Sequence, residues 1–181
     1  IRPAHGRLLL PGWTVSGGVP RSLSLLDSAQ AAEAAQGFTF LQISDSHIGF
    51  DKAANPHAID TLKEAMGKII ALPAKPSFMI HTGDITHLSK AEQFDNADKL
   101  IGSAGIAEHY VPGEHDVGDE GLGKAYLDRY GKNTKGAGWY SFDQNGVHFI
   151  GLVNVMNLKS GGLGNLGDEQ IAWLAAGRAG E

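Results

Sequence analysis

The chain has 181 residues, of which 42% are hydrophobic and 19% are charged, a composition typical of a globular domain with a sizeable core. Its net charge of -5, with no block of Lys and Arg, argues against a nucleic-acid-binding surface. Without cysteine, the chain has neither disulfides nor thiolate metal ligands. Any metal must therefore be held by His, Asp, Glu, Asn or water, a donor set that suits Mn, Fe or Zn.

Residues 1–37 differ in character from the rest of the chain. Arginines and a weakly apolar stretch precede an Ala-rich segment with A-x-A spacing at Ala32 and Ala34. This layout predicts the remnant of an export signal ending near Ala34 or Ala35, and hence a periplasmic location. The alternative is a flexible N-terminus with a frayed amphipathic helix. Since the chain begins at Ile1, we expect the start of the signal, with any twin-arginine pair, to lie upstream. No apolar run reaches the ~18 residues needed for a transmembrane segment.

From residue 38 onward, short apolar runs alternate with amphipathic stretches. The apolar runs predict strands at 38–44, 77–82 and 108–112, and a hairpin over 139–153 that turns at Asn145-Gly146. Hydrophobic periodicity and terminal signals predict helices at 56–72, at 89–105 with Ser89 as its cap, at 123–131 and at 167–177. This order predicts an α/β layered fold whose first half is largely parallel.

Polar clusters follow each of the first three predicted strands. They are Asp45 and His47 after the first, Asp84 after the second, and Glu114, His115 and Asp116 after the third. Ligands of open α/β sheets bind beyond the carboxyl ends of the strands. In an extended segment, residues two apart face the same way, so Asp45 and His47 can converge on one ion. The clusters together therefore predict a metal site at this edge of the sheet.

These motifs resemble the calcineurin-like metallophosphoesterase family, whose pattern is D-x-H, G-D, G-N-H-D/E, a later His and then G-H-x-H. The corresponding motifs are D-S-H at 45–47, G-D at 83–84 and G-E-H-D at 113–116, supported by the runs at 146–152 and 169–174. The resemblance covers residues 38–177. It implies a sandwich of β-sheets flanked by helices, with 38–181 as the N-terminal portion of the domain. With the apparent export signal, it points to a bacterial exported branch.

The resemblance also implies roles for the clustered residues. Two metal ions, Fe, Mn or Zn, would be held by Asp45 and His47 on the first, Asp84 on both, and position 114 on the second. A metal-bound hydroxide would attack a small phosphomonoester or phosphodiester. His115 would contact the phosphate and act as general acid, and Asp116 would orient His115.

The chain departs from the family pattern in two ways. Glu114 stands where the family has Asn, which adds a third carboxylate; this should hold metal more firmly and favour a trivalent ion, but repel an anionic substrate. The family's last His ligands do not follow, and no G-H-x-H is present. We therefore expect the sequence to be truncated at both ends and this portion alone to be nearly inactive. A non-catalytic exported module that binds a metal or a phosphorylated ligand is the alternative function.

Four other histidines and a tryptophan have less specific interpretations. His81 is either a packed strand residue or a support for the metal ligands. His87 lies at a loop edge, and a substrate-facing position is one of its two interpretations. His57 and His109 are interpreted as surface residues, and Trp139 as a core anchor.

Overall fold

A three-stranded parallel sheet organises the part of the chain that the computed structural model describes, which is residues 13–16, 19–22, 38–118, 123–155, 158 and 164–178. Its strands are β3 (Phe40–Ile43), β4 (Phe78–His81) and β5 (Ala107–Tyr110), in the order β3-β4-β5. Phe40 pairs with Phe78, and Phe78 with Ala107. Because the strands are parallel and in register, the chain leaves all three at the same edge of the sheet.

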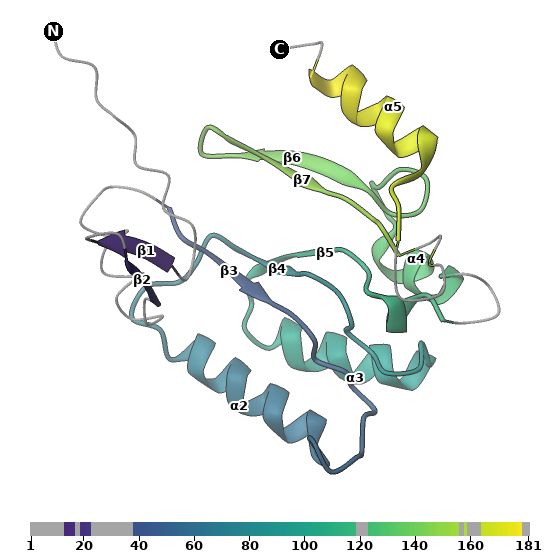
Figure 1. Ribbon diagram of the computed structural model, residues 1–181. Coiled ribbons are helices and arrows are strands. Elements are labelled where there is room, and N and C mark those ends of the chain that lie inside the picture. Colours follow the sequence, from purple (N-terminus) through teal and green to yellow (C-terminus); the bar gives the residue numbers. More distant parts are fainter. Residues whose placement is uncertain are drawn as a thin grey trace, which may run out of the picture.

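Two helices cover one face of this sheet (Figure 1). Helix α2 (Ala58–Ile70) connects β3 to β4, and α3 (Ala91–Gly102) connects β4 to β5. Their buried residues recur at helical spacing and pack with Leu41 and Met79 of the sheet; they are Leu62, Met66, Ile69, Phe94, Ala97 and Ile101.

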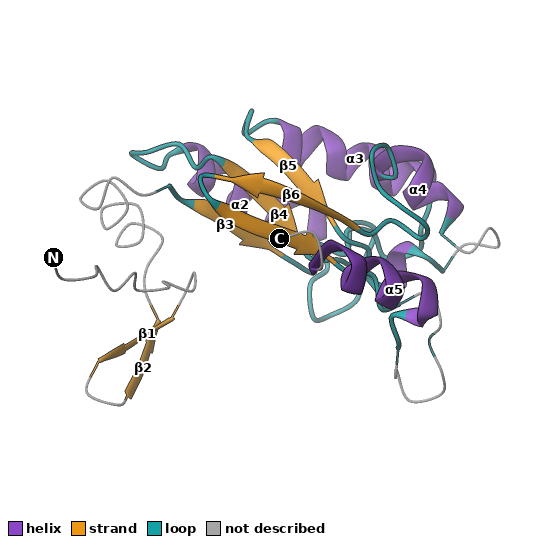
Figure 2. Ribbon diagram, turned by 90° about the horizontal axis from the view of Figure 1, so that it is seen from above, coloured by secondary structure: helices purple, strands orange, loops and turns teal. Residues whose placement is uncertain are grey.

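An antiparallel pair, β6 (Tyr140–Gln144) and β7 (Val147–Gly151), lies over the opposite face (Figures 1 and 2). Asn145 and Gly146 have φ of 51° and 77°, as expected for the predicted hairpin turn. Aromatic rings fill the space between the sheets; Phe78 lies 5.3 Å from Phe142, and His109 stacks on Phe142 at 3.9 Å. The sandwich with flanking helices agrees with the predicted fold class. The surface position predicted for His109 is wrong, because the ring is half-buried between the sheets.

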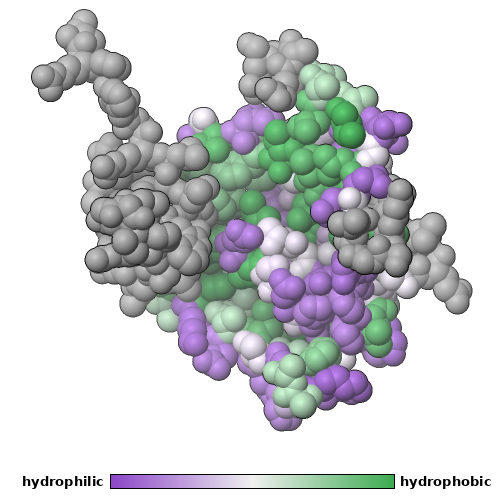
Figure 3. Space-filling model, in the orientation of Figure 1, coloured by the Kyte–Doolittle hydropathy of each residue, from purple (hydrophilic) through white to green (hydrophobic). Residues whose placement is uncertain are grey.

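Two further helices are α4 (Lys124–Tyr130) and α5 (Gly167–Arg178). Gln170 of α5 is buried and hydrogen-bonds to both the N–H and the carbonyl of Val153, which ties the helix to the segment just after β7. Apolar side chains gather where β6, β7 and α5 lie (Figure 3), and Ile150 and Ile171 there are exposed. Among the described residues, no helix combines the length and apolar character needed to cross a membrane.

The predicted helices and strands from residue 38 onward are present, within a few residues of their expected ends. One detail is wrong: α3 has Lys90 at its N-cap, and Ser89 instead donates its hydroxyl to the carbonyl of His115 at 2.6 Å. Within the segment interpreted as an export signal, β1 (Trp13–Ser16) and β2 (Val19–Ser22) form an antiparallel pair, not a helix. The Ala-rich stretch lies outside the described residues, so the export signal stays a prediction.

Candidate metal centre

The loops that follow β3 and β4 run side by side and extend the parallel pairing past the strands. Asp45 donates its N–H to the carbonyl of Gly83 at 3.0 Å, and His47 donates to that of Asp84 at 2.9 Å. Asp45, His47 and Asp84 have φ of 58°, 42° and 54°. Left-handed backbone is uncommon for residues other than glycine and persists where neighbouring structure enforces it. The hydrogen bonds between the loops supply that constraint here.

The third loop, after β5, approaches the second closely at two glycines. A Cβ atom on Gly83, whose φ is +113°, would lie 2.5 Å from the backbone nitrogen of Gly113. A Cβ atom on Gly113 would lie 2.1 Å from Oδ1 of Asp84. Since neither position has room for a side chain, both glycines are required for this packing. The approach lets His115 donate its backbone N–H to Oδ1 of Asp84 at 3.0 Å.

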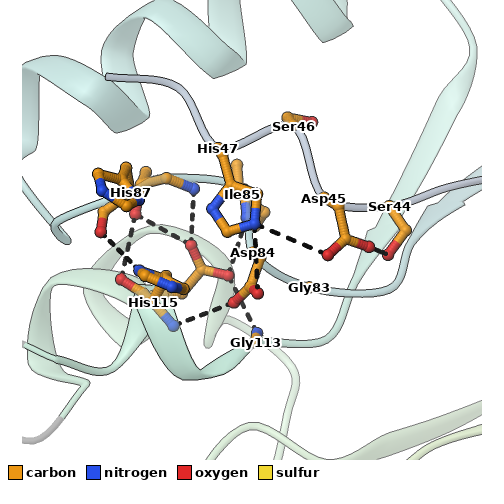
Figure 4. Close-up of polar contacts among 12 residues, drawn as sticks. Ser44, Asp45, Ser46, His47, Gly83, Asp84, Ile85, His87, Gly113 and His115 are labelled. Carbon is orange, nitrogen blue, oxygen red and sulfur yellow. Dashed lines mark hydrogen bonds and ion pairs between the residues drawn. The ribbon is translucent and has the colours of Figure 1, made fainter. Parts of the chain in front are cut away.

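Three of the four predicted metal ligands come together at this edge (Figure 4). Nε2 of His47 lies 3.7 Å from Oδ1 of Asp45 and 3.6 Å from Oδ2 of Asp84. One potential ligand atom from each residue lies within 4.8 Å of the other two. Two carboxylates that face one imidazole nitrogen form a donor set suited to Mn, Fe or Zn, so the residues fit a metal ion.

Glu114, the fourth predicted ligand, lies apart from these three. It begins the short helix η1 (Glu114–Asp116) and is exposed. Among the described residues, the groups of close potential ligand atoms do not include its carboxylate. Ligation by Glu114 requires its side chain to turn toward Asp84, and it stays a prediction.

A second group of close potential ligand atoms consists of His47, His87 and His115. The ring of His115 lies 4.8 Å from both other rings, and His47 lies 5.7 Å from His87. Sequence reasoning missed His87 as a member of this cluster. Its place three residues after Asp84, in the same loop, was the available signal.

The ring of His115 is held by a backbone group. Its Nδ1 lies 2.7 Å from the carbonyl oxygen of His87. Because a carbonyl oxygen can only accept a hydrogen bond, Nδ1 carries a proton, and a neutral ring leaves the lone pair on Nε2. The open nitrogen of His115 is therefore Nε2.

The structure contradicts the predicted contact of Asp116 with His115. The carboxylate of Asp116 is completely buried and accepts four hydrogen bonds, from the N–H groups of Ile85, Thr86 and Gly113 and from the hydroxyl of Thr86. These donors occupy both oxygens, so nothing remains to bond the imidazole. Asp116 instead fastens the third loop to the second. Burial raises its pKa, and the donated hydrogen bonds oppose that shift.

His81 supports the first loop from the strand side. Its Nδ1 accepts the N–H of Gly83 at 3.2 Å, so Nε2 carries the proton and donates to Oγ of Ser46 at 2.6 Å. Ser46 lies between the predicted ligands Asp45 and His47. Burial lowers the pKa of His81 to about 4, which keeps the ring neutral near pH 7. His81 is thus both a packed strand residue and a support for the ligand loop.

Comparison with known proteins gives one family match. The family model described as calcineurin-like phosphoesterase matches residues 38–176, a stretch that includes all three loops of the candidate site. No curated protein gives a significant match to the chain.

Proposed function

Because the chain belongs to the calcineurin-like phosphoesterase family, we propose that it hydrolyses small phosphate monoesters or diesters with the help of two metal ions. The observation that carries the proposal is the convergence of Asp45, His47 and Asp84 from two loops at one edge of the sheet. Carboxylates at such an edge, facing an imidazole, are suited to hold metal cations beside an anionic substrate.

Each predicted ligand has a role in this proposal. Asp45 and His47 would hold the first metal, Asp84 would contribute to both, and Glu114 would hold the second once its side chain turns inward. When bound, two metals would neutralise the phosphoryl oxygens and make the attacking water more acidic. The backbone N–H of His115 fixes Oδ1 of Asp84, so the third loop positions the shared ligand as well as the acid.

His115 is the proposed general acid, acting through Nε2. The carbonyl of His87 fixes the ring through Nδ1, so Nε2 is the nitrogen that can carry a proton to the leaving oxygen. Proton transfer of this kind contributes about 10²–10⁴-fold to a rate. Asp116 contributes to the acid role of His115 indirectly, because it anchors the loop that carries His115.

Hydrolysis of p-nitrophenyl phosphate and of bis-p-nitrophenyl phosphate tests the proposal in the full-length protein with added Mn²⁺. We expect turnover that chelation removes, that Asp84→Asn abolishes, and that His115→Gln lowers by about 10²–10⁴-fold. His57→Ala is the matched control, since His57 lies at the start of α2 and belongs to neither ligand group. Equal turnover by Asp84→Asn and the wild type would contradict the proposed site.

The second candidate function is a non-catalytic module that binds a metal or a phosphorylated ligand. Glu114 favours it, because a third carboxylate in the site would repel an anionic substrate. Tight metal binding without turnover of either ester would support this candidate and exclude the first. For either function we propose export to the periplasm. The protein should then be recovered in the periplasmic fraction, and removal of residues 1–37 should retain it in the cytoplasm.

A further inference from the structure

The cluster of three imidazoles has a capacity that the proposed reaction does not use. His47, His87 and His115 each present a ring nitrogen within 4.8 Å of the other two. We propose that these rings form a binding site for a divalent cation that prefers nitrogen ligands, such as Zn²⁺ or Cu²⁺. The site lies beside the pair of carboxylates that face His47, and shares that residue with them (Figure 4).

The state of the ring nitrogens favours a cation at this position. Nδ1 of His47 and Nδ1 of His87 are buried and have no hydrogen-bond partner among the described residues. A buried polar atom without a partner is costly, and most such atoms in folded proteins are satisfied by protein, water or an ion. His115 has only Nε2 to offer, because its Nδ1 is bonded to the carbonyl of His87. The three rings therefore hold nitrogen lone pairs that no described group uses.

The donor set predicts which cations would bind. Zinc lies about 2.0–2.1 Å from imidazole nitrogen, which places tetrahedral ligand atoms about 3.4 Å apart. The ring nitrogens lie within 4.8 Å of one another, so the rings would have to approach further on binding. Imidazole suits Zn²⁺ and Cu²⁺, whereas Mg²⁺ and Mn²⁺ prefer oxygen ligands. The carboxylates of Asp45 and Asp84, close to His47, add a favourable negative charge.

Binding at this site would engage two residues of the proposed reaction. Nε2 of His115 cannot donate a proton while it ligates a cation. His47 would be required as a ligand both by this cation and by the first metal of the proposed reaction. A nitrogen-preferring cation is therefore an inhibitor by this geometry. The inhibitory effect rests on the proposed function, whereas binding of the cation does not.

Electron paramagnetic resonance of bound Cu²⁺ tests the binding. The full-length protein is titrated with Cu²⁺ in excess Mg²⁺, and the hyperfine pattern reports the number of nitrogen ligands. We expect three nitrogens in the wild type. A single nitrogen would exclude a site made of three imidazoles and would overturn the proposal.

His87→Ala is the most informative variant, because it removes one ring while the backbone carbonyl that holds His115 stays in place. We expect two nitrogens and at least about a tenfold loss of Cu²⁺ affinity, since loss of even a supporting residue costs 10–100-fold at metal sites. His57→Ala is the matched control and should match the wild type. Unchanged affinity and nitrogen count in His87→Ala would also overturn the proposal.

Inhibition by Zn²⁺ separates this inference from the proposed function. In the presence of saturating Mn²⁺, His87→Ala should require at least about tenfold more Zn²⁺ than the wild type for the same fractional inhibition. Three nitrogens in the wild type that fall to two in His87→Ala, together with no inhibition, would support the cation site and contradict the acid role of His115. One nitrogen together with metal-dependent turnover would contradict the cation site and support the proposed function.

Discussion

Replacement of Asp116 by Asn should loosen the loop that carries His115. The buried carboxylate accepts N–H groups from Ile85 and Gly113 on Oδ2, and the N–H and hydroxyl of Thr86 on Oδ1, at 2.8–3.0 Å. An amide keeps one acceptor oxygen but replaces the other with an NH₂ donor. In the less costly orientation the NH₂ group faces Thr86. The hydroxyl of Thr86 can then rotate away, but its backbone N–H cannot and is left without an acceptor.

The cost follows from these contacts. One buried N–H group left without an acceptor costs about 1–3 kcal/mol. The two bonds that remain on the oxygen lose the strengthening that a charged acceptor provides, about 1 kcal/mol each. Removal of a buried charge offsets part of this, because burial disfavours the ionised form of Asp116. We expect the free energy of unfolding to fall by about 2–4 kcal/mol.

Urea unfolding of Asp116→Asn and of the wild type measures this loss. Asp128→Asn is the matched control: Asp128 is exposed and pairs with Lys124 on α4, so its replacement should change stability by no more than about 0.5 kcal/mol. Turnover should also fall, because the backbone of His115 moves with its loop. If Asp116→Asn unfolds at the same urea concentration as the wild type, the four hydrogen bonds do not hold this loop.

Three further predictions concern other parts of the site, and one of them has a matched control in α2. The pKa of His81 is about 4 when folded and about 6.5 when unfolded. The titration of His81 therefore leaves the free energy of unfolding unchanged above pH 6.5 and lowers it as the pH falls from 6.5 toward 4. Between pH 8 and pH 5 the wild type should lose about 2 kcal/mol more than His81→Gln in urea unfolding, and equal losses would refute the linkage. Gly83→Ala should lower stability by at least about 2 kcal/mol, because the new Cβ meets Gly113 in a left-handed backbone. By contrast Gly67→Ala, in open space within α2, should raise stability by about 0.5–1 kcal/mol, and thermal melts compare the two. Glu114→Asn should retain metal less firmly and turn over an anionic ester faster; unchanged metal content and kinetics would show that Glu114 is not a ligand.

The convergence of Asp45, His47 and Asp84 was predictable because it depends on strand order and direction. Asp45, His47 and Asp84 each follow an apolar run, and consecutive parallel strands bring their carboxyl ends to one edge. That reasoning needs only the positions of the strands, which hydrophobic runs and turn residues mark well. It succeeds even though the ends of the strands differ from the predicted ones by a residue or two.

The partners of individual side chains were not predictable in the same way. The bonds of Asp116 to Ile85 and Thr86 depend on two loops meeting at about hydrogen-bond distance, and periodicity carries no information about such a meeting. Ser89 matches the residue type of a helix cap, yet the carbonyl of His115 lies within reach and takes its hydroxyl. The place of His87 in the imidazole cluster was likewise not predictable, since the direction of its ring depends on loop conformation.

The left-handed backbone at Asp45, His47 and Asp84 limits how this centre could be copied. A synthetic peptide with the order Asp-Ser-His would adopt ordinary extended or helical backbone and aim its carboxylate and imidazole elsewhere. A transplant into another scaffold would have to carry these two loops with the hydrogen bonds between them, and also the third loop, whose Gly113 packs against Gly83. The smallest portable unit of the site is therefore a set of three packed loops, and its specification lies in the main chain as much as in the side chains.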